Sequence, residues 1–541
     1  MADTKREIER KFEFPASHGD RPRLPELTRV PGIAGVVDQG VVDLDAVYYD
    51  TPDLRLDAGS LTLRRRTGGA DAGWHLKLPV SEGVRDEVRA PLCDEPPPEL
   101  TALVRARVRA GRLVPVVRLL SSREVRHLLA DDGTLLAELS IDTVRAEGLT
   151  EGASSTAWTE IEVELADGVH DESILDGVEK QLRKAGIRPS TSASKVARAL
   201  RETAPPQARE DSRARADGAS GGTGDASGAS GEDRACGRAA EPADGTAGAE
   251  VLRYLRRQRD VLVAHDPAVR RDLPDAVHRM RVATRRLRSA FRSYAKVVDR
   301  AVTDPLGDEL KWLAGELGAD RDREVLTQRL RAHLKAVPRT LRLGPVRARL
   351  RVWSAARSAG TRRRTLAVLD GERYLALLDA LDALLAAPPL RPAAARPAAE
   401  VLAKAVLKDH RRLAGRIDTA LALAPGRRRD IALHEARKAA KRARYAAEAA
   451  KPLLGGPAKK AARRVKAVQG LLGDHQDSVV ARETLRLLAA QAHAAGESAF
   501  TWGLLYGREE AAAALAEREL PAVWARAAKP KLRRRLRAAG S

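Results

Sequence analysis

The sequence has few of the features that mark several large classes of protein. It contains two cysteines in 541 residues, Cys93 and Cys236, and no spacing pairs them. This excludes a disulfide framework and a cysteine-based zinc or redox site, and it is typical of a reducing compartment. No apolar run approaches the roughly 20 residues of a membrane helix, and the first residues lack the apolar core of a secretory signal. We therefore expect a cytoplasmic protein.

Positive charge, by contrast, is abundant and concentrated in the second half of the chain. Residues 251–541 hold 62 Lys and Arg against 30 Asp and Glu, whereas residues 1–200 hold 28 against 34. So basic a region attracts polyanions such as nucleic acid, polyphosphate or anionic lipid. Its aromatic residues are scattered without a stacking platform, and no nucleic-acid-binding signature is present. We therefore expect a phosphate polymer rather than nucleic acid as the partner, and no insertion into a membrane.

The chain changes texture twice, which predicts an α+β protein of two domains. Residues 204–249 are rich in Gly, Ser, Ala, Asp and Pro and nearly devoid of large apolar residues, which predicts a disordered linker. Before it, residues 1–203 contain eight alternating or β-rich runs. After it, residues 250–528 show helical spacing and predict an all-α domain, followed at 529–541 by a flexible basic tail. The predicted strands are 5–13, 42–50, 61–67, 73–79, 84–90, 115–126, 134–145 and 157–165, with helices near 98–110 and 171–201.

Charged residues alternate with apolar ones in several of the predicted strands. In EIERKFEF, Glu7, Glu9, Lys11 and Glu13 share one face, since successive side chains of a strand point to opposite faces. The same spacing recurs for Arg64 and Arg66, for His75 and Lys77, for Arg85, Glu87 and Arg89, and for Glu160, Glu162 and Glu164. The simplest interpretation is a sheet whose charged face meets water. Eight antiparallel strands can also close into a barrel whose interior holds a ligand.

An interior lined by both carboxylates and basic residues suits one kind of ligand, a short phosphate chain escorted by a divalent metal. Mg²⁺ and Mn²⁺ prefer carboxylate, water and phosphate oxygens. Arginine side chains neutralise the remaining phosphate oxygens. The metal could then orient a water for in-line attack on the terminal phosphorus. This chemistry requires no histidine or cysteine nucleophile.

The segment EIERK (7–11) resembles the ExExK signature of the CYTH family, the triphosphate tunnel metalloenzymes, and further segments follow in that family's order across residues 1–203. They are YYDTPDLRLDAGSLTLRRR (48–66), WHLKLP (74–79), VRDEVR (84–89), SIDTV (140–144), TEIEVEL (159–165) and SKVARAL (194–200). The resemblance implies an eight-stranded antiparallel tunnel with flanking helices, a Mg²⁺ or Mn²⁺ cofactor and a triphosphate substrate.

The same resemblance implies roles for individual residues. The metal ligands are Glu7, Glu9 and the late-strand glutamates Glu160, Glu162 and Glu164, and which of these three contact the metal is open. The triphosphate-binding residues are Lys11, Arg64, Arg66, Lys77, Arg85, Arg123 and Lys195. The catalytic residues are Glu7, Glu9, Lys11 and Asp142.

The helical half contains an internal repeat. HRMRVATRRLR (278–288) returns as HEARKAAKRAR (434–444), and LGADRD (317–322) returns as LGDHQD (472–477). Two elements in one order at nearly the same distance indicate duplication of a helical unit of roughly 150 residues. The repeated segments 278–288 and 434–444 each place a stripe of basic residues on one helix face. Like charges at this spacing repel each other, and a bound anion would offset the repulsion. A solvated charged face is the alternative. The two stripes are His278, Arg281, Arg285 and Arg288, and His434, Arg437, Lys441 and Arg444.

These repeated segments resemble the CHAD domain, a helical module similar to polyphosphate-binding modules. The resemblance implies two four-helix units, at about 250–395 and 396–528, whose basic stripes line a shared groove for polyphosphate. Lys311 and Lys466 correspond between the repeats and could join the stripes.

The resulting functional hypothesis is a metal-dependent triphosphatase. The tunnel would hydrolyse inorganic triphosphate or a similar short chain, and the helical domain would bind longer polyphosphate. One alternative is a polyphosphate-binding or targeting protein with a catalytically idle tunnel. Another is a CYTH enzyme that acts on thiamine triphosphate, or on ATP as an adenylate cyclase.

Overall fold

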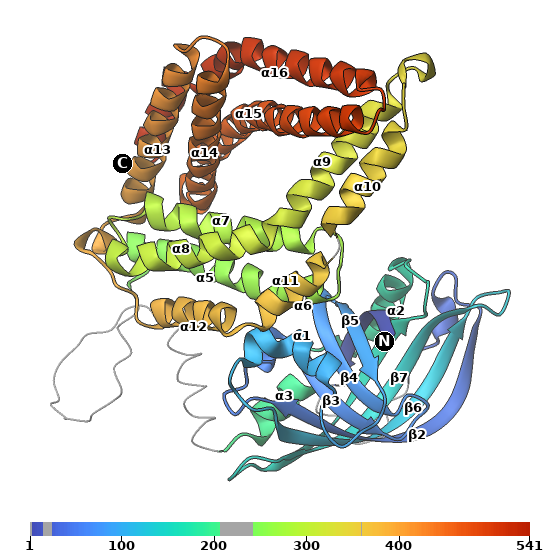
Figure 1. Cartoon of the computed structure of the whole chain (residues 1–541). Helices are drawn as coiled ribbons and strands as arrows, with labels where there is room; N and C mark the ends of the chain where they lie inside the picture. Colours follow the sequence, from blue (N-terminus) through green and yellow to red (C-terminus); the bar gives the residue numbers. More distant parts are fainter. Residues whose placement is uncertain (1–2, 15–23, 206–241, 359, 541) are drawn as a thin grey trace, which may run out of the picture. The chain divides into compact units, whose positions relative to one another are not determined.

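The structure is a computed structural model that describes residues 3–14, 24–205, 242–358 and 360–540. The chain divides into two compact units, Met1–Glu232 and Asp233–Ser541. Among the described residues, the first unit contains the strands and the helices α1, α2 and α3, and the second is helical (Figure 1). The α+β class is therefore confirmed.

The first unit is built around an antiparallel sheet of eight strands that closes on itself. Its hydrogen-bonded order is β5-β4-β3-β2-β6-β7-β8-β1, and β1 pairs again with β5 to complete the ring. A two-residue strand, β9 (Arg188–Pro189), adds to β1. The predicted eight-stranded barrel is confirmed. The strands are β1 (Asp3–Glu13), β2 (Gly35–Asp50), β3 (Thr62–Thr67), β4 (Gly73–Ser81), β5 (Val84–Ala90), β6 (Val114–Leu129), β7 (Leu135–Gly148) and β8 (Ser155–Leu165).

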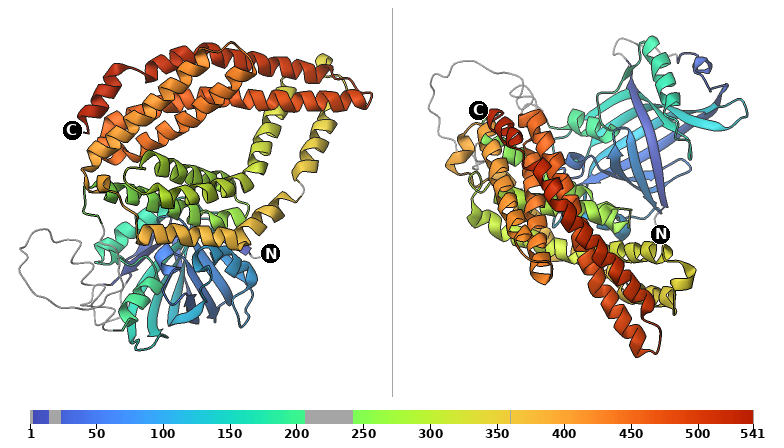
Figure 2. Two further views of the ribbon diagram at one scale, coloured as in Figure 1. Left: turned by 60° about the vertical axis from the view of Figure 1, so that its left-hand side comes forward. Right: turned by 90° about the horizontal axis from the view of Figure 1, so that it is seen from above.

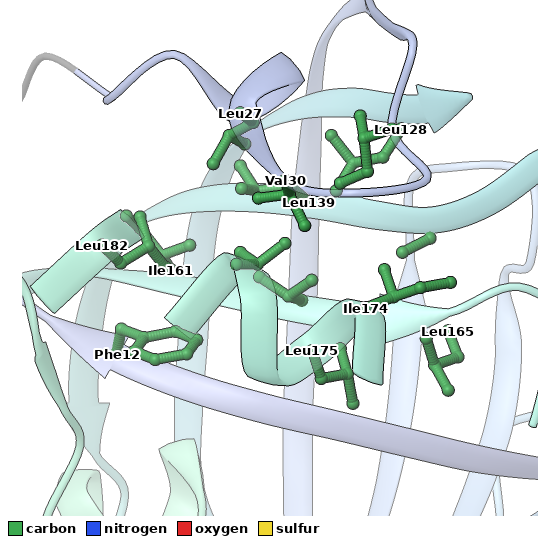
Figure 3. Packing of buried hydrophobic residues seen from close by; sticks show 14 of the residues in the cluster. Phe12, Leu27, Val30, Leu128, Leu139, Ile161, Leu165, Ile174, Leu175 and Leu182 are labelled. Carbon is green, nitrogen blue, oxygen red and sulfur yellow. The ribbon is translucent and has the colours of Figure 1, made fainter. Parts of the chain in front are cut away.

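Two of the three apolar patches of the barrel point outward, where helices cover them. Helix α2 (Ser173–Lys184) buries Ile174, Leu175, Val178 and Leu182, whose helical spacing forms one stripe. This stripe packs on outward residues of β1, β7 and β8 such as Phe12 (Figure 3). Helix α1 (Pro98–Val108) covers a second outward patch, centred on Trp74 and Leu76 of β4. Helix α3 (Lys195–Thr203) instead packs on the inner side of the sheet, against residues such as Tyr48 and Trp158 that share their strand faces with lumen residues. The opposite strand faces, which carry the charges, consequently point into the barrel.

Two arginines on the outer face hold their neighbours by ion pairs. Arg10 donates to Asp176 of α2 at 2.6 Å and to Glu179 at 2.8 Å, and so fastens that helix to β1. Arg118 makes two hydrogen bonds, of 2.9 and 2.6 Å, with the Asp45 carboxylate on β2. Short 3₁₀ turns occupy Leu27–Arg29 and Asp57–Gly59. Outward charges therefore serve the fold rather than the lumen.

The second unit is an array of helices that pack in antiparallel pairs, which confirms the predicted all-α domain. Helices α15 and α16 lie side by side, and α14 with α13 packs against them (Figure 2). One cluster joins helices of both repeats, since Leu330 of α9 and Leu350 of α10 pack with Leu485 of α15 and Trp502 of α16. The described helices are α5 (Ala247–Ala264), α6 (Asp266–Arg270), α7 (Ala276–Ser293), α8 (Arg300–Glu316), α9 (Gly318–Lys335), α10 (Val346–Ser358), α11 (Thr361–Asp370), α12 (Glu372–Ala386), α13 (Ala398–Leu421), α14 (Arg427–Ala449), α15 (Lys451–Ala494), α16 (Phe500–Ala527) and α17 (Pro530–Ala538), with 3₁₀ turns at Arg339–Leu341 and Pro392–Ala395.

The structure changes two of the predicted boundaries. Most of the predicted linker, residues 206–241, lies outside the described residues, but α5 already begins at Ala247, where the Thr246 hydroxyl caps it. The prediction of a flexible tail at 529–541 is wrong for Pro530–Ala538, which form α17. Leu532 and Leu536, one turn apart among the arginines, are buried, so the segment docks instead of remaining free. Among the described helices, none combines the length and the hydropathy needed to cross a membrane.

Candidate active site in the barrel and basic face of the helical unit

The barrel encloses a cavity of about 690 Å³ whose lining is dominated by charged side chains. Nine cationic and eight acidic residues line it. The cationic ones are Lys5, Lys11, Arg64, Arg66, Lys77, Arg85, Arg89, Arg123 and Lys195, and the acidic ones are Glu7, Glu9, Asp71, Glu87, Glu138, Glu162, Glu164 and Asp167. All seven residues predicted to bind triphosphate are among them, together with four of the five predicted metal ligands. Glu160 and the predicted catalytic Asp142 do not line the cavity but lie buried behind Lys195.

Glu7 and Glu9 on β1 are buried carboxylates that face lumen lysines. Lys77 Nζ lies 2.6 Å from Glu7 Oε2, and Lys11 Nζ lies 3.3 Å from Glu9 Oε1. Burial raises the pKa of Glu7, against the attraction of Lys77. Burial acts in the same direction on Glu9, but Lys11 and Lys77 outweigh it and lower the Glu9 pKa below its usual value. Two glutamate carboxylates on one strand face fit a hard divalent cation, which takes one or two protein carboxylates and completes its shell with water and phosphate oxygens.

A second group of carboxylates surrounds Lys195, the first residue of α3. The Lys195 ammonium lies 2.8 Å from Asp142, 3.0 Å from Glu160 and 2.5 Å from Glu162. One oxygen of each carboxylate lies within 4.8 Å of the other two, so the donor set is one that could hold a metal ion. In this arrangement the lysine supplies the compensating positive charge, and the carboxylates hold the pKa of Lys195 above its usual value despite burial.

Arg123 on β6 is held by the same group. Its guanidinium donates two hydrogen bonds to the Asp142 carboxylate, at 2.7 and 2.8 Å, and one to Glu162 at 3.1 Å. Asp142 on β7 and Arg123 on β6 face each other as register partners, so the guanidinium can make both hydrogen bonds to one carboxylate side by side. Asp142 is fully buried, so its position is that of a support for Arg123 and Lys195.

Sequence reasoning missed Glu87, a lumen carboxylate on β5 that several cations share. It lies 2.5 Å from Arg89 Nε, 3.0 Å from His75 Nδ1 and 3.6 Å from Arg64. The His75 Nε2 in turn lies 2.9 Å from the backbone carbonyl of Asp71. Burial opposes ionisation of Glu87, but His75, Lys77 and Arg64 lower its pKa far below the usual value. The alternation in VRDEVRA placed Glu87 on one strand face with Arg85 and Arg89, but nothing in the sequence showed which cations would converge on it.

The remaining lumen arginines leave positive charge only partly compensated. Arg64 donates to the Tyr48 hydroxyl at 3.3 Å, and Arg66 pairs with Asp71. Burial, followed by repulsion from Arg64, lowers the pKa of Arg66 to about 10. Arg85 donates to the Ala193 carbonyl at 2.7 Å, next to the start of α3. An anion in the lumen would relieve this repulsion.

In the helical unit, the two repeated motifs meet in corresponding ways. Arg281 of α7 donates to the Gly318 carbonyl at 3.4 Å, and a Cβ at Gly318 would lie 2.6 Å from the guanidinium. In the second repeat, a Cβ at Gly473 would lie 3.5 Å from Arg437. The absence of a side chain at Gly318 thus makes room for Arg281, whereas at Gly473 a methyl group would make an ordinary contact with Arg437. The stripe histidines differ, because His278 is exposed and His434 is half-buried with Nδ1 2.6 Å from Gln476 Oε1.

The other predicted polyphosphate-binding residues stay on the helix surfaces. Arg285 and Arg288 on α7 and Lys441 and Arg444 on α14 are half-buried. Lys311 on α8 and Lys466 on α15 are exposed. Sequence reasoning did not find one further cluster, in which Asp430, His475 and Glu517 bring together side chains of α14, α15 and α16. Arg482 and Arg429 pair with its two carboxylates, so the cluster is already compensated within the protein.

Comparison with known proteins matches both halves. The CYTH domain model matches residues 5–200, and the CHAD domain model matches residues 253–486. An uncharacterized protein of Mycobacterium tuberculosis (strain ATCC 25618 / H37Rv) is 38% identical over 526 residues, which cover 95% of this chain and 94% of the relative.

Solved structures resemble parts of the chain. PptA from Streptomyces chartreusis is 21% identical with a TM-score of 0.45, over 52% of this chain and 99% of that one. The CHAD domain from the plant Ricinus communis is 26% identical with a TM-score of 0.42, over 54% of this chain and 94% of that one. The CYTH family consists generally of triphosphate tunnel metalloenzymes. With both models matched in order and a relative similar along nearly its whole length, the chain belongs to the family of proteins in which a CYTH domain is followed by a CHAD domain.

Proposed function

We propose that the barrel unit hydrolyses inorganic triphosphate, or a similar short phosphate chain, with the help of a divalent metal. The observation that carries the proposal is the closed lumen, in which nine cationic side chains face eight acidic ones. Burying so many charges costs free energy unless each charge is paired with an opposite one. If one member of a pair is removed, the other is left buried and uncompensated. A phosphate chain with its metal supplies opposite charge to both sets at once.

The lumen cations would bind the phosphate oxygens. Lys11, Arg64, Arg66, Lys77, Arg85, Arg123 and Lys195 come from β1, β3, β4, β5, β6 and α3, so they can contact a chain from several sides. Arginine suits this role because its fork matches two phosphate oxygens. Holding the chain in the barrel orients its terminal phosphorus, and most of the rate in phosphoryl transfer comes from such positioning and charge stabilisation.

The acidic residues divide into two roles. Glu7 and Glu9 would hold the metal, with Glu162 and Glu164 on the neighbouring strand as further candidates, whereas Glu160 lies behind the wall. When bound, the metal neutralises phosphate charge and polarises the attacking water. Asp142 and Glu160 are positioning residues, which hold Lys195 and Arg123 at the lumen surface. Hydrolysis forms a bond from the water oxygen to phosphorus and breaks the phosphoanhydride bond, and the lining residues of the cavity include no histidine or cysteine for a covalent intermediate.

The site assignment is tested by replacing both metal-binding glutamates. Glu7→Gln/Glu9→Gln keeps the size of each side chain but removes the hard anionic ligands. We expect phosphate release from triphosphate with Mg²⁺ or Mn²⁺ to fall by about 10²-fold or more, the range for loss of a key electrostatic group. The matched control is Glu124→Gln/Glu147→Gln, since these glutamates pair with arginines on the outside of β6 and β7. Undiminished activity in the first variant, or equal loss in both, rejects the assignment.

For the helical unit we propose polyphosphate binding by the two basic stripes with Lys311 and Lys466. What supports it is that both repeats retain the stripe residues and that Arg281 and Arg437 each lie next to the glycine of an LG motif. The division into two four-helix units belongs to this proposal. If the protein is instead a binding or targeting protein with an idle tunnel, polyphosphate binding survives Glu7→Gln/Glu9→Gln, triphosphate turnover is absent from the unaltered chain, and neutralising Arg281, Arg285, Arg437 and Lys441 abolishes binding.

Two other substrates follow from the shared triphosphate group. Thiamine triphosphate and ATP both carry the chain that the lumen cations would contact. Turnover measured side by side for inorganic triphosphate, thiamine triphosphate and ATP, with cyclic AMP as an additional product assayed for ATP, decides among them. The highest kcat/KM for inorganic triphosphate is the expected result.

A further inference from the structure

Two strongly basic segments without any acidic residue meet in the second half of the helical unit. Residues 451–473 contain six Lys and Arg and no Asp or Glu, and residues 520–541 contain seven and none. The first segment opens α15, and the second includes α17. Folding therefore brings like charges together, which costs free energy unless something else compensates them.

Packing fixes the position of α17 against the rest of the unit. The helix contacts both α13 and α15, and its Leu532 and Leu536 are buried. Just after it, Gly540 lies so close to α13 that a Cβ there would be 2.5 Å from the Ala403 Cβ. Lys531, Arg534, Arg535 and Arg537 are exposed and Arg533 is half-buried, so α17 presents most of its charges from a fixed position.

Five of the basic residues form a cluster, Lys460, Arg463 and Arg464 from α15 with Lys531 and Arg535 from α17, which we call the α15–α17 surface. Repulsion from Arg464 is the first cause that lowers the pKa of Lys460, and Arg535, Arg463 and Lys531 add to it. Within the described part of the chain, none of the five pairs with a carboxylate, whereas many other basic residues of the unit do. Those paired residues include Arg300, Arg349, Arg373, Arg396 and Lys404.

We propose that the α15–α17 surface is an additional binding surface for a condensed phosphate chain, separate from the α7 and α14 stripes. The inference rests on the proposed polyphosphate binding of the helical unit and assigns it a second area of contact. Single-stranded nucleic acid is the less suitable partner, because such partners are held by exposed aromatic side chains. The described aromatic residues nearest in sequence, Tyr445 and Trp524, are both buried.

The first test compares two variants that lose the same charge. One replaces the five residues of the α15–α17 surface with Gln, and the control replaces Arg300, Arg349, Arg373, Arg396 and Lys404 with Gln. Affinity of the full chain for long-chain polyphosphate is measured by fluorescence anisotropy between about 50 and 200 mM salt. We expect about 10-fold weaker binding and a shallower salt dependence for the surface variant, by up to about four in the log–log slope, and a smaller change for the control. Equal losses overturn the proposal, since total charge would then suffice.

The second test keeps every charge and removes the anchor. Leu532→Ser/Leu536→Ser should release α17, which hydrogen exchange across residues 530–538 would register, and should weaken polyphosphate binding several-fold. If hydrogen exchange shows that α17 is released but the affinity of this variant for polyphosphate is unchanged, the proposal that binding needs a fixed α15–α17 surface is overturned. A duplex DNA arm identifies the ligand class, because a larger loss for DNA than for polyphosphate in the surface variant contradicts the proposal. If the unaltered chain fails to bind polyphosphate, the proposed function of the whole helical unit is rejected. If the unaltered chain binds polyphosphate and the surface variant binds it equally well, this inference alone is rejected.

Discussion

At the scale of residues, the protein is organised by how buried charges are compensated. Lumen lysines and arginines pair with lumen carboxylates, and Glu87 and Lys195 each gather several partners. Such groups are costly to break, because removal of one member leaves the others buried and uncompensated. The compensation is also exchangeable, since phosphate can replace a carboxylate and a metal can replace an ammonium. Lys195 and Asp266 test this account in the two units.

Lys195 balances three carboxylates, so its removal should destabilise the barrel. We expect Lys195→Met to lower the free energy of unfolding by about 3 kcal/mol, the order of a broken buried ion pair. Added Mn²⁺ should restore part of the loss, because Asp142, Glu160 and Glu162 present oxygens within reach of one ion. Denaturant unfolding with and without Mn²⁺ measures both effects, with Lys195→Arg as the conservative control. A variant as stable as the unaltered chain would contradict the described compensation.

Asp266 in the helical unit is a buried acid whose pKa is raised, whereas the pKa of lumen carboxylates such as Glu87 is lowered. Burial raises the pKa of Asp266 to about 6, although Arg270 donates to it at 2.6 Å. A pKa that is higher in the folded than in the unfolded state favours folding most at low pH, and this contribution is lost as pH rises from about 4 to about 6. The difference in unfolding free energy between Asp266→Asn and the unaltered chain should therefore change across this window and be flat above it. A difference independent of pH from 4 to 7 would refute the assignment.

At the scale of elements, patterns along the sequence predicted most of what was found. Most strand ranges agreed to within about three residues, because charged and apolar residues alternate along them, and that period has only one backbone solution. The exception is β2, which begins at Gly35 rather than at residue 42. Alternation could not say which face would point inward. That choice depends on α1 and α2, whose apolar residues need the uncharged strand face. Helix α17 was missed because the many arginines suggested a flexible tail, although Leu532 and Leu536 are spaced one turn apart. Glu87 was given no role because that role depends on partners from β3, β4 and β5.

The repeated glycines provide a matched pair of substitutions at this scale. A methyl group at Gly318 would lie 2.6 Å from the Arg281 guanidinium, whereas at Gly473 it would lie 3.5 Å from Arg437, an ordinary contact. Gly318→Ala should displace the end of Arg281 and weaken polyphosphate binding about 3- to 10-fold, less than for a whole charged hydrogen bond because the guanidinium is shifted and not removed. Gly473→Ala should leave binding nearly unchanged. Anisotropy titrations of the two variants compare them directly, and the reverse order of effects would count against the stripe as the binding face.

At the scale of the whole molecule, the chain joins two compact units of opposite charge balance. The first has 28 basic against 34 acidic residues over residues 1–200, and the second has 62 against 30 over residues 251–541. Each unit has hydrophobic clusters of its own, so each can unfold as a cooperative body. On this account, triphosphate with a metal would stabilise the barrel unit, and a long polyphosphate chain would stabilise the helical unit.

Calorimetry of the full chain should consequently show two unfolding transitions. A ligand that binds one folded unit raises the transition of that unit alone, by mass action. We expect triphosphate with Mn²⁺ to raise one transition and long-chain polyphosphate the other, with the truncated range 1–205 used to assign the first. A single transition that both ligands raise equally would show that the units unfold together.

The central claim is that the inward-facing charges of the barrel bind the triphosphate. Isothermal titration of triphosphate with Mn²⁺ into the full chain, into Arg64→Gln/Lys77→Gln and into Arg10→Gln/Arg118→Gln tests it most directly, because both variants lose two charges but only the first pair faces the lumen. The account predicts that Kd rises about 100-fold or more in the lumen variant, as expected for two lost charged hydrogen bonds, and changes little in the outer one. Equal affinities in the two variants would contradict it.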